Sequence, residues 1–326
     1  MAFTSGSAPT ILDLIDALRV FAVAQGWTNN HYGSDGSGQR LHLSKGSCFV
    51  NIRACVNETF TGNTEVFAAS SGYGLWVNLS TGFTGSGTAW YKQAGANYEV
   101  SSAVNKYRYS GIMGNNTSVN YWIFAFSDVI YLIVENPSGT YHWLGFGNIQ
   151  KIGDWTGGAF LFSKHQRSEV VTTKVMPFSY PMYIGLGSAE MLIYVSGFDG
   201  LTGYVSAYPV GTGNFISYRC LDDIQYKSVL WEVPPNIATG KPIILPVSAI
   251  ILRDTVFSFT MPFSIVGKFQ ELNFINYQGL IPASDYDDGT GALYKIFPFH
   301  QKADTTAISG TPNSTTGTLG FAIKSN

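Results

Sequence analysis

The stretch Asn120-Tyr-Trp-Ile-Phe-Ala-Phe-Ser-Asp-Val-Ile-Tyr-Leu-Ile-Val134 decides the fold class of this chain. Two runs of β-branched and aromatic residues, 121–126 and 129–135, stand on either side of Ser127-Asp128. Strand-forming runs joined by only two residues are typical of a tight antiparallel hairpin. Ser-Asp is a weaker turn former than Asn-Gly, since both central residues of the best hairpin turn take positive φ angles. The stretch predicts two adjacent antiparallel strands.

Short strand-like runs continue on both sides of this hairpin and alternate with turns rich in Gly, Ser, Thr and Asn. They cover residues 40–45, 47–56, 74–79, 89–92, 106–109, 190–196 and 204–208. Short strands at such regular spacing are typical of a sandwich or barrel rather than of βαβ units. The fold class is therefore predicted to be mainly β, with antiparallel sandwich-like or barrel-like sheets.

One amphipathic helix is predicted near the N-terminus, over about residues 10–25. Thr10 and Asp13 fit a capping box, and Gly26 is a natural stop. Apolar side chains recur at helical spacing between them, at Ile11, Leu14, Ile15, Leu18, Phe21 and Ala22. A core helix of its own chain is the favoured interpretation of this apolar face, and a helix that docks on a partner is the alternative.

The chain divides most naturally near residue 160. Gly157-Gly158 is followed by a polar stretch over residues 163–174. We expect a helix plus β domain over residues 1–160 and a β-rich C-terminal domain over residues 161–326, with a single large domain as the alternative. A Thr/Ser/Gly-rich stretch over residues 304–320 is expected to be a long loop, followed by a closing strand at residues 321–323.

The amino-acid composition excludes several classes of protein. Charged residues make up only 12% of the 326 residues, against about 25% in an ordinary soluble domain, while aromatic residues make up 15%. High hydrophobicity excludes disorder, and a formal net charge of -2 shows no nucleic-acid footprint. A surface so poor in charge is natural where neighbouring subunits cover it. Other copies of the chain are therefore expected partners.

The cysteines and the N-terminus bear on the compartment. No secretory signal is visible at the start, and no run of 18 apolar residues predicts a membrane helix. The cysteines are Cys48, Cys55 and Cys220, and an odd number without a signal argues against a disulfide framework. We expect all three to be small buried side chains.

Motifs for chemistry are scarce. None of the five histidines stands in a zinc-binding pattern, and no nucleotide-binding or nucleophile motif is present, so no cofactor is expected. One weak metal candidate is the cluster of Asp285, Asp287 and Asp288 before Gly289. It resembles a calcium loop, but Ile296 occupies the twelfth position, where an EF-hand has Glu. A solvated turn is the favoured interpretation.

Aromatic residues are the remaining candidates for function. They crowd the middle of the chain, at Tyr107, Tyr109, Tyr121, Trp122, Tyr141, Trp143 and Trp155. Aromatic side chains anchor interfaces, and on a β surface they can bind sugars. Tyr107, Tyr109, Trp143 and Trp155 are the candidates for an interface or for a host surface glycan. Packing in the core is the alternative for all of them.

Three segments carry a resemblance to a known family. The first is the opening, Phe3-Thr-Ser-Gly-Ser-Ala-Pro-Thr-Ile-Leu-Asp, which leads through the predicted helix to Gly26-Trp27. The second is the hairpin, followed by Tyr141-His-Trp-Leu-Gly-Phe146. The third is Leu293-Tyr-Lys-Ile-Phe-Pro-Phe-His300, then a polar loop and Phe321-Ala-Ile-Lys324. In these segments the chain resembles tailed-bacteriophage virion structural proteins, although the Asn-Gly turn usual there is replaced by Ser127-Asp128.

The resemblance implies a non-enzymatic virion protein of the tail or baseplate, assembled in the host bacterial cytoplasm with copies of itself and other virion proteins. It supplies no catalytic residues. A head decoration or collar protein is the nearest alternative, and a receptor-binding or glycan-binding virion protein is another. A tail-borne glycosidase would need two carboxylates facing a cleft about 5–10 Å apart, and nothing in the sequence suggests that pair.

Overall fold

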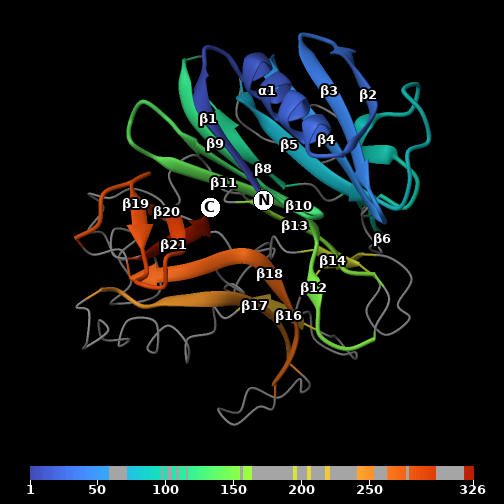
Figure 1. Ribbon diagram of the computed structural model, residues 1–326. Coiled ribbons are helices and arrows are strands. Elements are labelled where there is room, and N and C mark those ends of the chain that lie inside the picture. The colour runs from blue at the N-terminus through green and yellow to red at the C-terminus, as the bar shows by residue number, and fades with distance from the viewer. Residues whose placement is uncertain are drawn as a thin grey trace, which may run out of the picture.

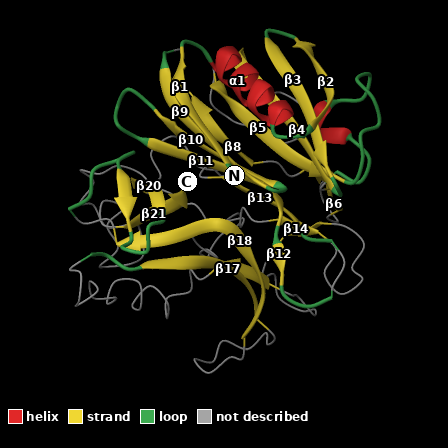
Figure 2. Ribbon diagram, in the orientation of Figure 1, coloured by secondary structure: helices red, strands yellow, loops and turns green. Residues whose placement is uncertain are grey.

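The computed structural model describes residues 1–58, 72–96, 98–100, 105–107, 110–114, 117–154, 157–163, 194–196, 204–206, 217–220, 241–252, 263–276, 279–298 and 319–326. They form three larger antiparallel sheets, a two-stranded ribbon, the α-helix α1 (Ile11–Ala24) and the 3₁₀ helix η1 (Trp90–Lys92) (Figures 1 and 2). No helix in this part of the chain is long and apolar enough to cross a membrane.

The central sheet has the strand order β1-β9-β10-β11-β13-β14-β15. Its strands are β1 (Ala2–Ala8), β9 (Val119–Phe126), β10 (Val129–Glu135), β11 (Tyr141–Asn148), β13 (Ala159–Ser163), β14 (Tyr194–Ser196) and β15 (Tyr204–Ser206).

The helix-side sheet has the order β2-β3-β4-β5-β8. Its strands are β2 (Thr28–Asp35), β3 (Gly38–Lys45), β4 (Cys48–Glu58), β5 (Gly72–Ser80) and β8 (Ser110–Gly114), while β6 (Tyr98–Val100) and β7 (Asn105–Tyr107) form the ribbon.

The C-terminal sheet has the order β16-β17-β18-β21-β20-β19, and β12 also pairs with β18. Its strands are β12 (Gln150–Lys151), β16 (Ser217–Cys220), β17 (Ile244–Leu252), β18 (Phe263–Asn276), β19 (Asp285–Asp287), β20 (Leu293–Pro298) and β21 (Leu319–Lys324). The prediction of a mainly β fold of antiparallel sheets is confirmed. The barrel-like alternative is wrong, because the sheets remain open, with separate edge strands.

The predicted hairpin is the β9–β10 pair, in which Phe126 faces Val129 across the turn. Its turn does not use the left-handed backbone that Asn-Gly would supply. Among the described residues other than glycine, only Asn57, Glu271 and Ala283 have positive φ. Contacts from neighbouring elements support the turn instead: Lys45 Nζ donates to the Ser127 carbonyl, and the Asn148 amide donates to the Asp128 carbonyl at 3.0 Å.

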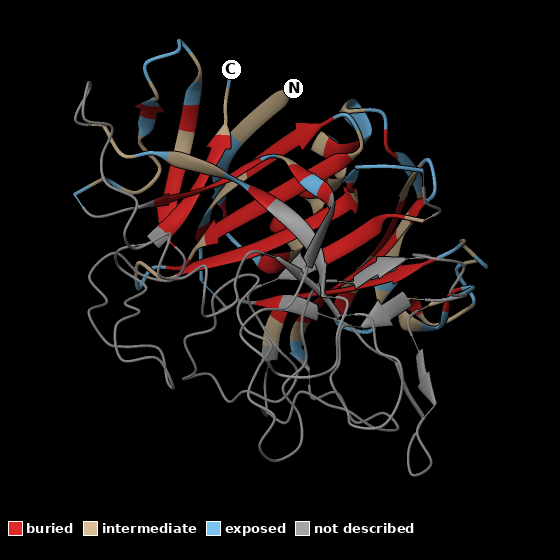
Figure 3. Ribbon diagram, turned by 90° about the horizontal axis from the view of Figure 1, so that it is seen from below, coloured by how far each residue is buried: buried red, intermediate tan, exposed pale blue. Residues whose placement is uncertain are grey.

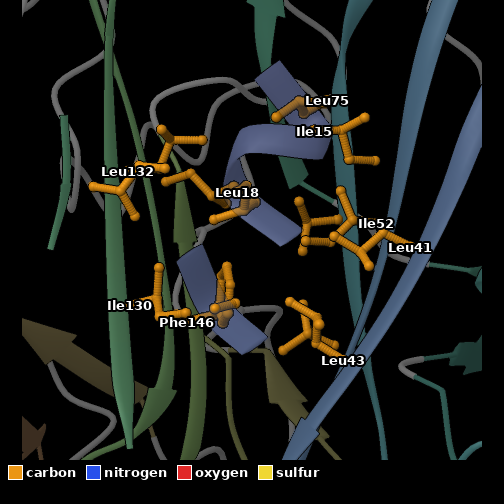
Figure 4. Close-up of a cluster of buried hydrophobic side chains, with 14 of the residues drawn as sticks. Ile15, Leu18, Leu41, Leu43, Ile52, Leu75, Ile130, Leu132 and Phe146 are labelled. Atoms are coloured by element: carbon orange, nitrogen blue, oxygen red, sulfur yellow. The ribbon is translucent and has the colours of Figure 1, made fainter. Parts of the chain in front are cut away.

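The helix begins where the capping box predicted. The Thr10 hydroxyl accepts a hydrogen bond from the Asp13 amide at 3.2 Å, and the Asp13 carboxylate accepts one from the Thr10 amide at 3.0 Å. The helix ends at Ala24, and Gln25 is its C-cap. Gly26 follows with a φ of +80°, a backbone conformation that favours glycine. Ile15 and Leu18 point into the space between the central and helix-side sheets (Figure 4). The helix is therefore part of its own chain's core.

Strand β10, in the middle of the central sheet, is buried on both faces. All residues from Val129 to Val134 are buried, so β10 shows no polar alternation. Ile130 and Leu132 belong to the core shared with α1 and the helix-side sheet (Figure 4). Figure 3 shows that the described strands in the interior are largely buried. Tyr131 points the other way, because its hydroxyl donates to the Gln270 carbonyl in β18 at 3.0 Å. The three sheets form layers, with the central sheet in the middle.

An aromatic layer joins the central sheet to the C-terminal sheet. The Trp143 ring lies 4.7 Å from the Phe321 ring and 5.7 Å from the Phe297 ring, in edge-on geometry. Phe160 and Phe269 make a similar contact at 4.8 Å. Edge-on aromatic pairs add to the energy of burial, so this layer contributes strongly to holding the two sheets together.

The predicted division near residue 160 stays a prediction. β13 spans that position and pairs with both β11 and β14 in the central sheet. The closing strand predicted at residues 321–323 is confirmed as part of β21. Most of the loop predicted over residues 304–320 lies outside the described residues.

Candidate functional site

The aspartate cluster lies at the β19–β20 turn. Asp285 and Asp287 point outward from β19, where Lys295 Nζ lies 3.0 Å from Asp285 and Lys241 Nζ lies 3.5 Å from Asp287. The Asp288 carboxylate accepts hydrogen bonds from the amide and hydroxyl of Thr290 at 2.8 and 2.7 Å. These bonds, led by the Thr290 hydroxyl, lower the pKa of Asp288. The contacts are those of a turn whose carboxylates are neutralised by lysines and satisfied locally.

The described residues contain no cluster of side chains arranged to hold a metal ion. No group of three or more His, Cys, Asp or Glu side chains there is arranged to hold an ion. Cys48 and Cys55 are buried, as predicted for these two, and the side chain of Cys220 lies outside the described residues. Burial raises the pKa of Cys48 far above its usual range.

Of the four aromatic residues predicted to bind a partner or a glycan, the structure describes the side chain of one, Trp143. Trp143 is fully buried between the central and C-terminal sheets, so its assignment as an interface or glycan residue is wrong. Burial on both faces of the central sheet is the reason. Tyr107 lies in β7, but its side chain is outside the described residues, as are Tyr109 and Trp155. Their assignment stays a prediction.

The most site-like feature is a row of polar side chains on the outer face of the helix-side sheet. On β3 and β4, Leu41, Leu43, Val50 and Ile52 point to the core. The alternating residues between them point to the opposite face, because successive side chains of a strand alternate. Those side chains, here called the polar row, are Arg40 and His42 on β3, Asn51 and Arg53 on β4, and Asn78 and Ser80 on β5. Only Arg40 is not fully buried.

His42 stands in the middle of this row. Its Nδ1 lies 2.8 Å from the Asn51 side-chain oxygen, and the Asn51 amide donates to the Ser80 hydroxyl at 3.0 Å. The His42 Nε2 atom is buried and has no hydrogen-bond partner among the described residues. Burial lowers the pKa of His42 to about 4. His42 is therefore held neutral at neutral pH.

A charged triad lies at the end of the row. Asp35 contacts Arg40 Nε at 2.7 Å and Arg53 Nε at 2.6 Å. The Arg40 hydrogen bond is the main cause that lowers the pKa of Asp35 to about 2, and Arg53 adds to it. Two guanidinium groups therefore share one carboxylate at this end of the row.

A loop, residues 81–96, covers the polar row and contains η1. Arg40 donates from Nη1 to the carbonyls of Ser86 and Thr88 at 3.0 and 3.1 Å. The Phe83 ring lies 5.0 Å from the His42 ring. Further along, Trp90 packs with Cys55 and Trp76 in a small buried cluster. The loop therefore closes the outer face of the sheet.

Within the loop, the buried side chain of Gln93 organises the backbone. It accepts from the Thr84 amide at 2.8 Å and donates to the carbonyls of Thr88 and Ala89 at 3.1 and 3.2 Å. The side chains of Arg40 and Gln93 therefore make their hydrogen bonds to the backbone of this loop. The arrangement is suited to anchoring the loop on the sheet.

The polar row was not predicted from the sequence, although a signal exists. Polar and apolar residues alternate along β3, from Arg40 to Ser44, and along β4, from Val50 to Ala54. Such alternation indicates a two-faced sheet, but the polar face of such a sheet is usually solvated. Only the loop over it shows that these polar residues are buried.

Comparison with models of known protein families finds no match to this chain, and none of the curated proteins matches it.

Proposed function

We propose that this chain is a non-enzymatic structural component of a tailed-bacteriophage virion, placed in the tail or baseplate and acting through contacts with neighbouring subunits. The observation that carries the proposal is how the three segments of the resemblance lie. Phe3 of the opening stacks on Phe124 of the hairpin at 4.7 Å. Phe297 and Phe321 of the ending both pack on Trp143, which follows the hairpin. The resemblance therefore concerns one connected part of the fold.

The surface supports assembly. Among the described strands β1 lies at the edge of the central sheet, and the backbone of its exposed residues, Ser5 to Ser7, is of the kind that can pair with a strand from another chain. Val20 and Val23 on α1 are 53% and 43% exposed. A chain with only 12% charged residues also has little to oppose association.

The copy number of the chain in purified particles tests the proposal. Quantitative mass spectrometry of the phage that encodes it, calibrated against the major shell protein in the same sample, is expected to give a small multiple of three or six. Such a value fits a symmetric tail or baseplate part. A copy number close to that of the shell protein would place the chain on the head and overturn the tail assignment. Absence from the particle would overturn the virion proposal.

A second measurement addresses assembly by the isolated chain. We expect the purified protein to self-associate at high concentration in light scattering. Replacing Val20 with Glu should weaken this association if α1 takes part, whereas replacing Lys92 with Glu, on the exposed part of the loop, is the matched control. A clean monomer at high concentration would argue against assembly through copies of the same chain.

A further inference from the structure

We propose that His42 is an acid-sensitive trigger that releases the loop of residues 81–96 from the outer face of the helix-side sheet. The release would separate Trp90 of the loop from Cys55 and Trp76 on the sheet and so expose these two side chains. This inference does not depend on the virion assignment, since it uses only contacts within the chain.

The first argument is the position of the His42 ring. It is 1% exposed, lies under Phe83 of the loop, and lies 5.9 Å from the His31 ring of the neighbouring strand. Phe83 also stacks on His31 at 6.5 Å. The loop therefore rests on two imidazole rings, and any change in the charge of His42 acts directly beneath it.

The second argument is that a proton on His42 would find no acceptor. Nδ1 is already hydrogen-bonded to Asn51, and the buried Nε2 has no partner in the part of the chain that the structure describes. In the protonated imidazolium both nitrogens carry a hydrogen, so a buried donor would be left unsatisfied. Leaving a buried charged donor without a partner costs a large part of its hydration energy. Opening the loop would return this nitrogen to water.

The third argument is the charge around His42. From β2 it faces His31 and, at the end of that strand, Asp35; from β3 it faces Arg40; and from β4 it faces Asn51, with Arg53 two residues further along. Within residues 81–96 the only charged side chain is Lys92. Its Nζ lies 5.6 Å above the Tyr91 ring. His31 and Arg40 both oppose a further positive charge on His42, and Asp35 offsets them in part.

The direction of the pH effect follows from these contacts. Burial, with His31 and Arg40 adding to it, lowers the pKa of His42 from its ordinary 6.5 to about 4 in the closed form. The closed form binds fewer protons than the open form between these values. Its stability is therefore full above about pH 6.5 and falls as the pH drops toward about 4.

Thiol labelling provides the test, because Cys55 lies in the cluster under the loop while Cys48 lies in the core between the sheets. The full chain is treated with 4,4′-dithiodipyridine at about pH 7.5 and about pH 4.5, and adducts are assigned by peptide mass spectrometry. Rates are normalised to those of the same cysteines in the denatured chain. We expect the ratio of Cys55 to Cys48 labelling to rise at least about tenfold at the lower pH.

Two variants make the test specific. His42→Gln keeps a polar group beside Asn51 but cannot be protonated, and it should abolish the rise. His142→Gln removes another buried histidine, on the central sheet, and should retain the rise. An unchanged ratio in the wild-type chain, an equal rise at Cys48, or a full rise in His42→Gln would each overturn the proposal.

Hydrogen exchange in the wild-type chain provides a readout that needs no variant. The Thr81 amide donates to the Ala94 carbonyl at 2.9 Å, and this bond ties the two ends of the loop together. Exchange at Thr81 should accelerate on acidification, after correction for the intrinsic pH dependence, while the amides of β10 stay protected. An equal acceleration at the amides of β10 would indicate global unfolding and would contradict a release confined to the loop.

Discussion

The Phe297 ring meets the Trp143 ring at 87°, with their centroids 5.7 Å apart. Phe297 comes from β20 of the C-terminal sheet and Trp143 from β11 of the central sheet. Phe297 also contacts Trp122 at 5.2 Å and Tyr141 at 6.2 Å. One phenylalanine therefore packs among aromatic side chains of β9 and β11, the two strands on either side of β10, and this contact holds the C-terminal sheet against the central sheet.

Truncating this side chain should loosen the contact between the two sheets. We expect Phe297→Ala to lower the free energy of unfolding by about 3–5 kcal/mol, because it leaves a cavity among rings that cannot all collapse into it. Chemical denaturation measures the loss. Phe3→Ala is the control, since Phe3 is only partly buried and stacks on Phe124. Equal losses in the two variants would contradict the central position of Phe297.

The β9–β10 turn depends on a glycine in the next strand. Gly147 has φ +145°, and a Cβ built there would lie 2.1 Å from the Asp128 carbonyl oxygen. We expect Gly147→Ala to cost about 2–4 kcal/mol, since neither backbone can move without breaking the pairing of β10 with β11. Gly85→Ala is a matched control, with φ +135° but open space around the position. Thermal unfolding of the two variants should separate steric conflict from backbone conformation.

Lys45 should stabilise the same turn from the other side. Its Nζ donates to the Gln25 carbonyl at 2.9 Å and to the Ser127 carbonyl, so one ammonium joins the end of α1 to the hairpin turn. We expect Lys45→Met to lower stability by about 1–3 kcal/mol, because hydrogen bonds to a charged group are lost. Lys268→Met, at an exposed position of β18, should stay within about 0.5 kcal/mol in the same denaturation assay.

Asp35 should control stability at very low pH. Its pKa is lowered from 3.8 to about 2, chiefly by Arg40, so its ionised form is favoured by the fold. The stabilisation is complete above about pH 3.8 and is lost as the pH falls through about 2. We expect Asp35→Asn to lower stability at neutral pH by about 1–3 kcal/mol and to flatten this acid-dependent loss.

The surface pair of Asp16 and Arg19 provides the comparison for Asp35. Their side chains lie 2.7 Å apart within one helix and are 46% and 27% exposed. Asp16→Asn should therefore change stability by less than about 1 kcal/mol. A larger effect at Asp16 than at Asp35, measured by denaturation at neutral pH, would contradict the assignment of Asp35 as the anchor of two arginines.

Several elements could be predicted from the sequence because their signals are local. The capping box at Thr10, the stop at Gly26 and the two-residue connection at Ser127-Asp128 each depend on residues close together in the chain. The turn at Asp288 could also be predicted, because the hydrogen-bond partner of Asp288 is Thr290, only two residues away. Helical periodicity and turn chemistry need no knowledge of distant residues.

Other properties depend on which distant segment covers a given face. The sequence by itself determined a mainly β fold with one helix and a central hairpin. Only the tertiary structure decided that Trp143 is enclosed by Phe297 and Phe321, and that His42 is buried under the loop of residues 81–96. Alternation of polar and apolar residues along a strand indicates only that the two faces of the sheet differ. Long-range packing decides which segment covers each face. Burial under that segment then shifts the pKa of the side chains there.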